Sequence, residues 1–378
     1  MTAKKLGFGM MRLPLLDPND SKSFDYEQVQ NMIDEYMAAG FNYFDTAWMY
    51  HGGKSEELVK RCLLGKYPRD SYTVTDKLPD YILGPGRTPQ QVFETQLERT
   101  GLDYFDYYLI HDTNAGSIDN FEKYHCFEFI EGLLDKGLVK HIGLSHHDGP
   151  ELLEEILLRH PRIEFVQLQI NYLDWDSLGV RARECYEVAV KYGKKVLVME
   201  PVKGGTLAQI PEAAEKIFKE AEPEMSVPSW AIRFAASWPE VYMVLSGMSN
   251  LEQLRDNMSY MNDFRPLDEK EMGVIKKALD IINGNIAIEC TGCNYCTVDC
   301  PMNVQIPRLF SLYNAELQEA DFKSWSSHEE LYNNLVLTEG IGVASDCIEC
   351  GLCESHCPQH LEIREHLKTV KKHFEDRQ

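Results

Sequence analysis

The chain has 378 residues, 44% of them hydrophobic and 26% charged, which is typical of a folded globular protein with a sizeable core. Its formal net charge of -22 at pH 7 argues against binding to nucleic acid or to anionic membrane surfaces, because both attract basic patches. No apolar run reaches the ~18 residues of a membrane span and no clean signal-peptide core is present, so we expect a cytoplasmic protein.

The first 285 residues alternate strand-like and helix-like runs. The strand-like runs are short and apolar, which is typical of a parallel sheet buried on both faces. Eight such repeats over about 250 residues predict a (β/α)8 TIM barrel and a first domain over residues 1–285. The predicted strands are residues 5–10, 41–47, 72–78, 104–111, 140–145, 165–170, 195–200 and 241–247.

Several predicted helices carry start and stop signals. Ser55 is placed to cap the helix that follows it. Thr88 precedes Pro89 at a first helical position, and Gly101 follows the last turn of the same run. Helices are predicted over residues 25–40, 55–65, 88–101, 121–137, 226–238, 249–258 and 268–282.

Polar side chains with complementary chemistry fall where three successive strands end. Asp45 and Tyr50 follow the second strand, Lys77 the third, and His111 the fourth. Alone, each has an ordinary explanation, such as a helix cap or a surface charge. Because barrel enzymes place their chemistry at the ends of strands, the four together favour a catalytic site.

These residue types fit proton delivery to a carbonyl oxygen while a hydride reaches its carbon. A phenol has a reference pKa of ~10, and the nearby Lys77 ammonium is expected to lower the pKa of Tyr50. Asp45 would hold Lys77 charged and in place, and His111 would orient the substrate oxygen. General acid–base help of this kind is worth ~10²–10⁴-fold in rate.

The texts FDTAWMYHGGKSEELV, TDKLP, LIHD and HIGLS resemble the aldo/keto reductases, in order, from residue 4 to about residue 260. The resemblance implies that Asp45, Tyr50, Lys77 and His111 form a catalytic tetrad with Tyr50 as proton donor. It also implies a nicotinamide cofactor across the barrel mouth. Its implied contacts are Ser145 and Gln167 at the carboxamide, and Gly247, Ser249, Gln253 and Asn257 at the adenosine end.

Two positions depart from that family pattern. His146 stands where the family usually has Asn, so the carboxamide contacts differ. Ser249 stands where NADP-using relatives carry Lys or Arg, and Arg255 is nearby but in a different helical phase. Since a basic residue would supply a charge-assisted hydrogen bond to the 2′-phosphate, its absence favours NAD over NADP, or loose selectivity between the two. No flavin motif is present, although barrels bind flavin without one.

Two cysteine runs lie in a predicted second domain, residues 286–378. Both CTGCNYCTVDCP and CIECGLCESHCP read C-x2-C-x2-C-x3-C-P, the bacterial ferredoxin signature for [4Fe–4S] clusters. Zinc sites instead use two C-x2-C pairs as a rule, which leaves the doubled run unexplained. In this signature the fourth cysteine reaches the other cluster. The predicted ligand sets are Cys290, Cys293, Cys296 and Cys357 for one cluster, and Cys300, Cys347, Cys350 and Cys353 for the other.

The runs are separated by a long insert, residues 302–346. Residues 308–320 and 326–337 have apolar positions at helical spacing. The segment therefore resembles α-helical ferredoxin modules more than the compact bacterial ferredoxin. The whole chain resembles the iron–sulfur aldo/keto reductases of anaerobic bacteria and archaea.

Three functions follow as hypotheses. The first is an oxidoreductase that reduces or oxidises a small carbonyl or alcohol, with the clusters near Tyr50 carrying electrons to or from a ferredoxin- or flavodoxin-like partner. The second is an NAD(P)H-dependent carbonyl reductase with structural or oxygen-sensing clusters. The third is a non-enzymatic electron-transfer or binding subunit, which a complete tetrad disfavours.

Overall fold

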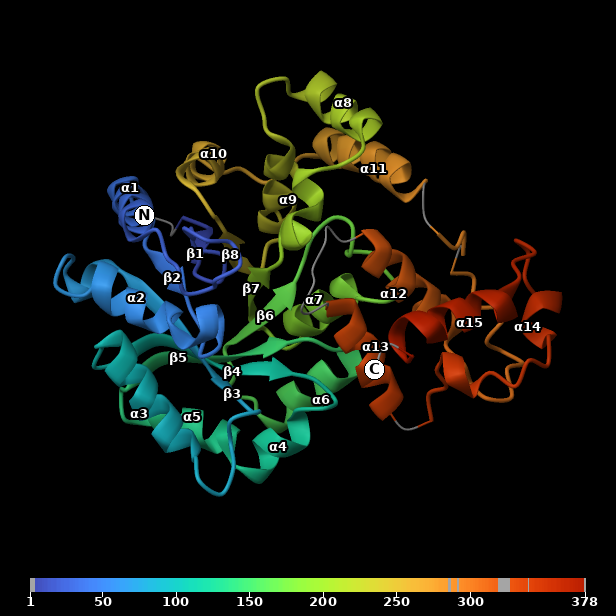
Figure 1. Cartoon of the computed structure of the whole chain (residues 1–378), viewed down its shortest axis with the longest axis horizontal. Coiled ribbons are helices and arrows are strands. Elements are labelled where there is room, and N and C mark those ends of the chain that lie inside the picture. Colours follow the sequence, from blue (N-terminus) through green and yellow to red (C-terminus); the bar gives the residue numbers. More distant parts are fainter. Residues whose placement is uncertain (1–3, 285–286, 291, 319–326, 339, 377–378) are drawn as a thin grey trace.

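The fold was obtained as a computed structural model, which describes residues 4–284, 287–290, 292–318, 327–338 and 340–376. Eight parallel strands pair in sequence order, and β8 pairs with β1 to close a barrel (Figure 1). The predicted TIM barrel is therefore confirmed. The strands are β1 (Leu6–Gly9), β2 (Tyr43–Asp45), β3 (Thr73–Pro79), β4 (Phe105–Thr113), β5 (Val139–His146), β6 (Phe165–Gln169), β7 (Lys195–Met199) and β8 (Val241–Gly247).

Helices surround the strands in the same alternation (Figure 1). The predicted helix over residues 121–137 is interrupted, because His125 has a left-handed φ of 53° between two shorter helices. The helices of the barrel region are α1 (Tyr26–Ala38), α2 (Ser55–Cys62), α3 (Pro89–Thr100), α4 (Ile118–Lys123), α5 (Cys126–Asp135), α6 (Pro150–Arg159), α7 (Ala182–Lys191), α8 (Glu212–Ala221), α9 (Val227–Ala236), α10 (Leu251–Met261) and α11 (Glu269–Asn283).

The predicted caps have different outcomes at two helices. Thr88 caps α3 by accepting a backbone N–H of the first turn, and Gly101 ends the helix with a φ of 68°, as expected. Ser55 makes no cap bond for α2. Its buried hydroxyl instead lies 2.8 Å from that of Thr46 and 3.1 Å from the carbonyl oxygen of Met10. The cap prediction for Ser55 was wrong because tertiary contacts took its hydroxyl.

The barrel interior is packed with side chains. Alternate residues of a strand face the same side. Asp45 therefore shares the inner face with Tyr43, and His111 with Tyr107 and Leu109, so the polar residues form a layer above the apolar filling. That buried filling consists of Tyr43, Tyr107, Leu109, Phe165, Leu197, Met243 and Leu245.

A helical segment follows the barrel, at one side of it in Figure 1. It contains α12 (Ile306–Gln318), α13 (Ser327–Leu337), α14 (Leu352–Ser355) and α15 (Ile363–Phe374). The helices predicted over 308–320 and 326–337 correspond to α12 and α13, but residues 319, 320 and 326 lie outside the described residues. So does the predicted domain boundary at residues 285 and 286. Among the described helices, none is both long and apolar enough to cross a membrane.

Candidate active site and cluster cavities

The predicted tetrad residues come together at the carboxyl ends of β2, β3 and β4. Asp45 is the last residue of β2, Lys77 lies within β3 and His111 within β4. Tyr50 begins a short 3-10 turn after β2. Lys77 and Asp45 are almost completely buried, whereas Tyr50 is partly exposed at the mouth.

Lys77 holds this group together. Its Nζ lies 2.6 Å from Oδ1 of Asp45, 2.8 Å from the carbonyl oxygen of Thr46 and 3.3 Å from the hydroxyl of Tyr50. An ammonium has three protons, and these are three acceptors for them. Burial opposes the charge of Lys77, but the Asp45 carboxylate outweighs burial, so the pKa of Lys77 is raised. Lys77 therefore remains a cation beside the phenol.

The expected low pKa of Tyr50 is not found. Burial raises the pKa of Tyr50 above its ordinary value, and the attraction of Lys77 only partly offsets that effect. The phenol is therefore held in its protonated form. That state can give a proton to a substrate, which is the role expected of a proton donor.

His111 closes the group on the other side of Tyr50. The two ring centroids are 6.3 Å apart and nearly perpendicular, at 86°. Burial, together with repulsion from Lys77, lowers the pKa of His111 to about 3. The imidazole is therefore neutral, and one of its nitrogens carries a proton that can be donated to a substrate oxygen.

Ser145 and Gln167, the expected carboxamide contacts, are neighbours at the same end of the barrel. They are paired in register between β5 and β6, and both are buried. Oγ of Ser145 lies 3.0 Å from Nε2 of His147. Within the described residues, Oε1 of Gln167 is buried with no hydrogen-bond partner. An unpaired buried acceptor here fits the N–H donor of a carboxamide.

The expected adenosine contacts surround the loop after β8, which ends at Gly247. The amide nitrogen of Ser249 donates to Oε1 of Gln253 at 2.7 Å. Asn257 is buried, and its side-chain amide donates to the hydroxyl of Ser246 at 2.9 Å, so it ties α10 to the end of β8. Ser249 of the loop and Gln253 in the first turn of α10 are thus exposed side by side, whereas Asn257, farther along α10, is buried.

Arg255 does not point its charge at this loop. Its Nε and Nη2 donate to the carboxylate of Glu35 in α1, at 2.8 and 2.6 Å. A bidentate pair of this kind fixes the guanidinium in place. Arg255 therefore bridges α10 and α1 at the protein surface.

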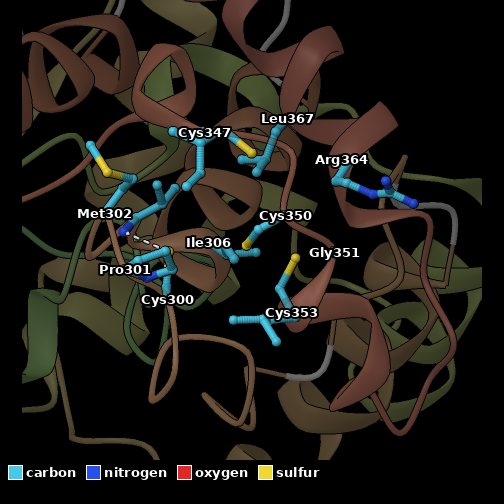
Figure 2. A pocket seen from close by; sticks show the side chains of 13 residues that line it. Cys300, Pro301, Met302, Ile306, Cys347, Cys350, Gly351, Cys353, Arg364 and Leu367 are labelled. Atoms are coloured by element: carbon cyan, nitrogen blue, oxygen red, sulfur yellow. Dashed lines mark hydrogen bonds between the residues drawn. The ribbon is translucent and has the colours of Figure 1, made fainter.

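The eight cysteines of the two runs line two cavities. Each cavity receives three cysteines of one run and the fourth of the other, and the remaining lining is mostly apolar, including Ile306 in both. Four thiols around such a space fit a [4Fe–4S] cluster. The first cavity has Cys290, Cys293, Cys296 and Cys357, and the second, shown in Figure 2, has Cys300, Cys347, Cys350 and Cys353.

The first cysteine run touches the barrel. The α-carbon of Gly292 is so close to Leu178, in the loop after β6, that a Cβ would lie 2.5 Å from the leucine side chain. Nearby, the hydroxyls of Ser177 and Ser311 are 3.1 Å apart. In Figure 1, α14, which carries Cys353 of the second cavity, lies at the edge of the molecule far from the barrel. The first cavity is thus the one next to the barrel.

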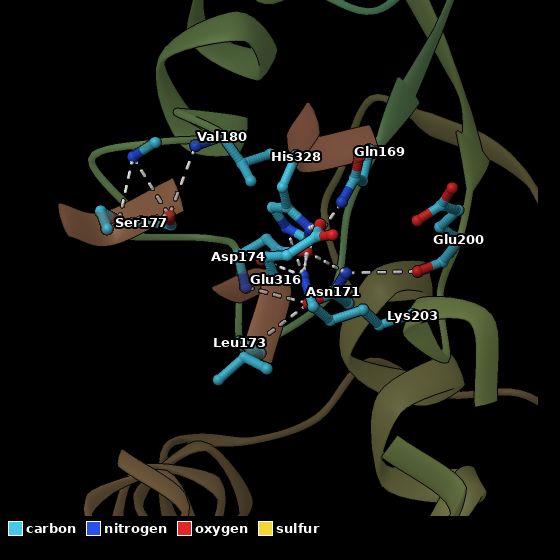
Figure 3. Close-up of polar contacts among 12 residues, drawn as sticks. Gln169, Asn171, Leu173, Asp174, Ser177, Val180, Glu200, Lys203, Glu316 and His328 are labelled. Carbon is cyan, nitrogen blue, oxygen red and sulfur yellow. Dashed lines mark hydrogen bonds and ion pairs between the residues drawn. The ribbon is translucent and has the colours of Figure 1, made fainter. Parts of the chain in front are cut away.

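A buried polar network, which the sequence did not indicate, joins the barrel to α13 (Figure 3). Nζ of Lys203 donates to both carboxylate oxygens of Asp174, at 2.8 and 2.9 Å, and to Nε2 of His328 at 2.9 Å. All three residues are buried. No local pattern marks them, because Lys203 is 29 residues from Asp174 and 125 from His328.

Comparison with known proteins covers both parts of the chain. The sequence profile described as "Aldo/keto reductase family" matches residues 5–280, and that described as "4Fe-4S dicluster domain" matches residues 289–361. The uncharacterized oxidoreductase YqkF of Bacillus subtilis is 25% identical over 276 residues, or 65% of this chain and 86% of the relative. L-galactose dehydrogenase of Arabidopsis thaliana is 23% identical over 270 residues, which cover 66% of this chain and 83% of the relative.

Solved structures show the same barrel. The holo form of aldo-keto reductase AKR11C1 from Bacillus halodurans has a TM-score of 0.58 at 24% identity, and covers 72% of this chain and 91% of its own. An aldo-keto reductase from Klebsiella pneumoniae in complex with NADPH has a TM-score of 0.56 at 18% identity, and the match covers 73% of this chain and 95% of that structure. At these identities the likeness establishes the fold.

Proposed function

This chain belongs to the aldo/keto reductase family and is an oxidoreductase with a C-terminal 4Fe-4S dicluster domain, and from that premise we propose that its barrel interconverts a small carbonyl compound and the corresponding alcohol. The observation that carries the proposal is the position of Nζ of Lys77. It lies 2.6 Å from Asp45 and 3.3 Å from the hydroxyl of Tyr50, at the open end of the barrel.

Tyr50 is the proposed proton donor in the reducing direction. Its phenol gives its proton to the substrate oxygen as negative charge develops there. The phenolate left behind is stabilised by the Lys77 ammonium, which Asp45 keeps charged and fixed. In the oxidising direction the same phenolate accepts the proton of the alcohol.

His111 is the proposed second contact to the substrate oxygen. Its ring stands edge-on to Tyr50, so both side chains border the same space at the mouth. A neutral imidazole N–H stabilises the developing oxyanion by a hydrogen bond while leaving the proton transfer to Tyr50. Lys77 is too deeply buried to do this, because its side chain is not exposed.

A nicotinamide cofactor, when bound, supplies the hydride. Ser145 and Gln167 would hold its carboxamide, a role that the buried, unpaired Oε1 of Gln167 fits. The loop around Ser249 would hold the adenosine end; a nicotinamide cofactor is also present in the structure of the Klebsiella pneumoniae aldo-keto reductase, which was solved in complex with NADPH. We propose NAD as the preferred form, because Ser249 is uncharged and Arg255 is bound to Glu35.

The clusters, when bound, supply one-electron transfer. Cys290, Cys293, Cys296 and Cys357 would hold one beside the barrel, and Cys300, Cys347, Cys350 and Cys353 the other, farther away. With one cluster in each of these adjacent cavities, electrons could pass between the barrel and the surface of the protein. We propose a small redox protein, ferredoxin- or flavodoxin-like, as the partner at the outer end.

The catalytic proposal is tested with Tyr50→Phe, assayed with NADH and NADPH on a panel of small aldehydes and ketones. We expect kcat/KM to fall ~10²–10⁴-fold. Tyr192→Phe is the matched control, because its hydroxyl contacts Glu154 on the outside of the barrel at 2.7 Å. An unchanged rate in Tyr50→Phe would refute the assignment.

A second candidate function, a carbonyl reductase with structural clusters, is favoured by the way α13 is fixed to the barrel through buried contacts with Lys203. The two candidates differ in anaerobic stopped-flow kinetics of a Cys293→Ser, Cys350→Ser variant. If carbonyl reduction by NADH proceeds at the wild-type rate with the fold intact, the clusters do not take part in turnover.

A further inference from the structure

Three side chains with metal-binding atoms meet at the barrel mouth, outside the tetrad. Asp112 follows His111 in β4, His147 comes directly after β5, and Glu330 belongs to α13. One ligand atom from each lies within 4.8 Å of the other two, and all three residues are partly buried. We propose that Asp112, His147 and Glu330 bind a divalent metal ion, separate from the two iron–sulfur clusters.

The donor set selects the kind of ion. Two carboxylate oxygens and one imidazole nitrogen suit first-row dications such as Mn²⁺, Fe²⁺ and Zn²⁺, whereas Ca²⁺ and Mg²⁺ prefer oxygen ligands alone. The carboxyl groups of Asp112 and Glu330 are in hydrogen-bond contact, so their oxygens already face one another, and a dication bound between them would neutralise both charges.

The residues around the triad support such a site. Nδ2 of Asn114, itself buried, donates to Oδ1 of Asp112 and to Oε1 of Glu330, each at 2.9 Å. The hydroxyl of Ser145 lies 3.0 Å from Nε2 of His147. Hydrogen bonds from neighbouring groups typically orient the side chains that bind a metal. The triad is thus held by its surroundings on two sides.

The site exists only when the C-terminal segment is seated on the barrel. One turn beyond Glu330, Nδ2 of Asn334 donates to the backbone oxygen of His147 at 3.2 Å. Earlier in α13, His328 contacts Lys203. These contacts fix the face of α13 that carries Glu330.

Three protein ligands leave coordination positions for water or for a substrate atom. The charges of Asp112 and His147 both act on the imidazole of His111, so the proposed ion lies near the side chain that is expected to contact the substrate oxygen. An ion there would bind a substrate that offers a second oxygen, such as a hydroxyl or carboxylate next to the carbonyl. This part of the inference rests on the proposed function, whereas metal binding does not.

The test is a titration of the holoprotein with Mn²⁺, in which the EPR signal of free Mn²⁺ measures how much of the metal remains unbound. The clusters are kept oxidised, because [4Fe–4S]²⁺ has no EPR signal of its own. We expect saturation at a single ion per chain, with displacement by Zn²⁺. Glu330→Gln should weaken binding at least about tenfold, by analogy with the effect of losing a group around a metal.

Glu330→Gln keeps an oxygen that can accept from Asn114, so the seating of α13 is retained, and hydrogen exchange of α13 checks this. Glu329→Gln, which changes the neighbouring carboxylate of the same helix, is the control and should bind Mn²⁺ like the wild type. The proposal is overturned if neither Mn²⁺ nor Zn²⁺ binds, or if Glu330→Gln binds as tightly as the control. The triad would then be a hydrogen-bonded network only. Because the readout is binding, its failure is distinct from failure of the proposed catalysis.

Discussion

Nζ of Lys203, in the loop after β7, lies 2.9 Å from Nε2 of His328, at the start of α13. The same ammonium is bound by Asp174. Burial opposes ionisation of Asp174, but Lys203, together with His328 and Asn171, outweighs burial and holds the pKa of that carboxyl below its usual range. A single buried cation therefore connects the barrel with the segment that carries the clusters.

Substitution of Lys203 and substitution of His328 should lower the stability of the protein by different amounts. Lys203→Met leaves the buried Asp174 without its cation, and we expect the free energy of unfolding to fall by about 3–5 kcal/mol. His328→Leu leaves the Lys203–Asp174 ion pair intact. It removes the hydrogen bond with Lys203, worth about 1.5–3 kcal/mol as a bond to a charged group, and the contact of His328 with Glu316. Hydrogen exchange measured by mass spectrometry should show faster exchange in α13 and unchanged β-strands for His328→Leu. Equal acceleration of the strands would contradict this assignment.

The pH dependence of carbonyl reduction follows from the raised pKa of Tyr50. The phenol donates only while it is protonated, so activity is lost as the pH rises through its pKa. Since burial raises that pKa above the reference value of ~10, the rate should be flat between about pH 6 and about pH 9. The measurement is kcat/KM for a non-ionising aldehyde. A fall in rate centred near about pH 8 would contradict this prediction, because it would mean that the attraction of Lys77 lowers the pKa of Tyr50 by more than burial raises it.

Paired cysteine variants test the crossed ligand sets. In Cys290→Ser with Cys357→Ser, both changes fall in the first cavity, so one cluster and about four irons per chain should remain. In Cys347→Ser with Cys357→Ser, the changes fall in different cavities, so both clusters should be lost. Iron and sulfide analysis after anaerobic purification distinguishes the two. If each run held its own cluster, the two variants would give the opposite results.

Cofactor preference should change at Ser249. We expect the wild type to bind NADH at least as tightly as NADPH. Ser249→Arg should tighten NADPH binding about tenfold to a hundredfold, because a charge-assisted hydrogen bond to the 2′-phosphate contributes about 1.5–3 kcal/mol. Binding of NADH, which lacks this phosphate, should change little. Arg255→Gln is the control, because Arg255 already binds Glu35. Loss of NADPH binding in Arg255→Gln would show that Arg255 reaches the phosphate.

The fold and the candidate tetrad could be anticipated because their signals are local. A strand sends alternate side chains inward, so its sequence also fixes which of its residues face the barrel interior. This periodicity, together with the order of strands and helices, predicts Asp45, Lys77 and His111 at one end of the barrel. The spacing of the cysteine runs is similarly local, since three thiols of each set lie within seven residues.

Local signals failed where two distant groups compete for one partner. Ser55 had the position of a helix cap, but its hydroxyl is taken by Thr46 and Met10. Lys77 does stabilise the phenolate of Tyr50, yet burial of the phenol raises its pKa by more than Lys77 lowers it. The size of each effect depends on packing, which the order of residues does not reveal.

By itself, therefore, the sequence determined the barrel, the inward-facing acid, ammonium and imidazole, and a pair of four-cysteine sets. Only the tertiary structure decided which loops meet: α13 seated on the barrel by His328, Glu330 beside Asp112, and Arg255 bound to Glu35. The physical reason is one of range. Backbone geometry repeats every two or 3.6 residues and can be read along the chain, whereas a contact between residues two hundred positions apart exists only once the core has packed.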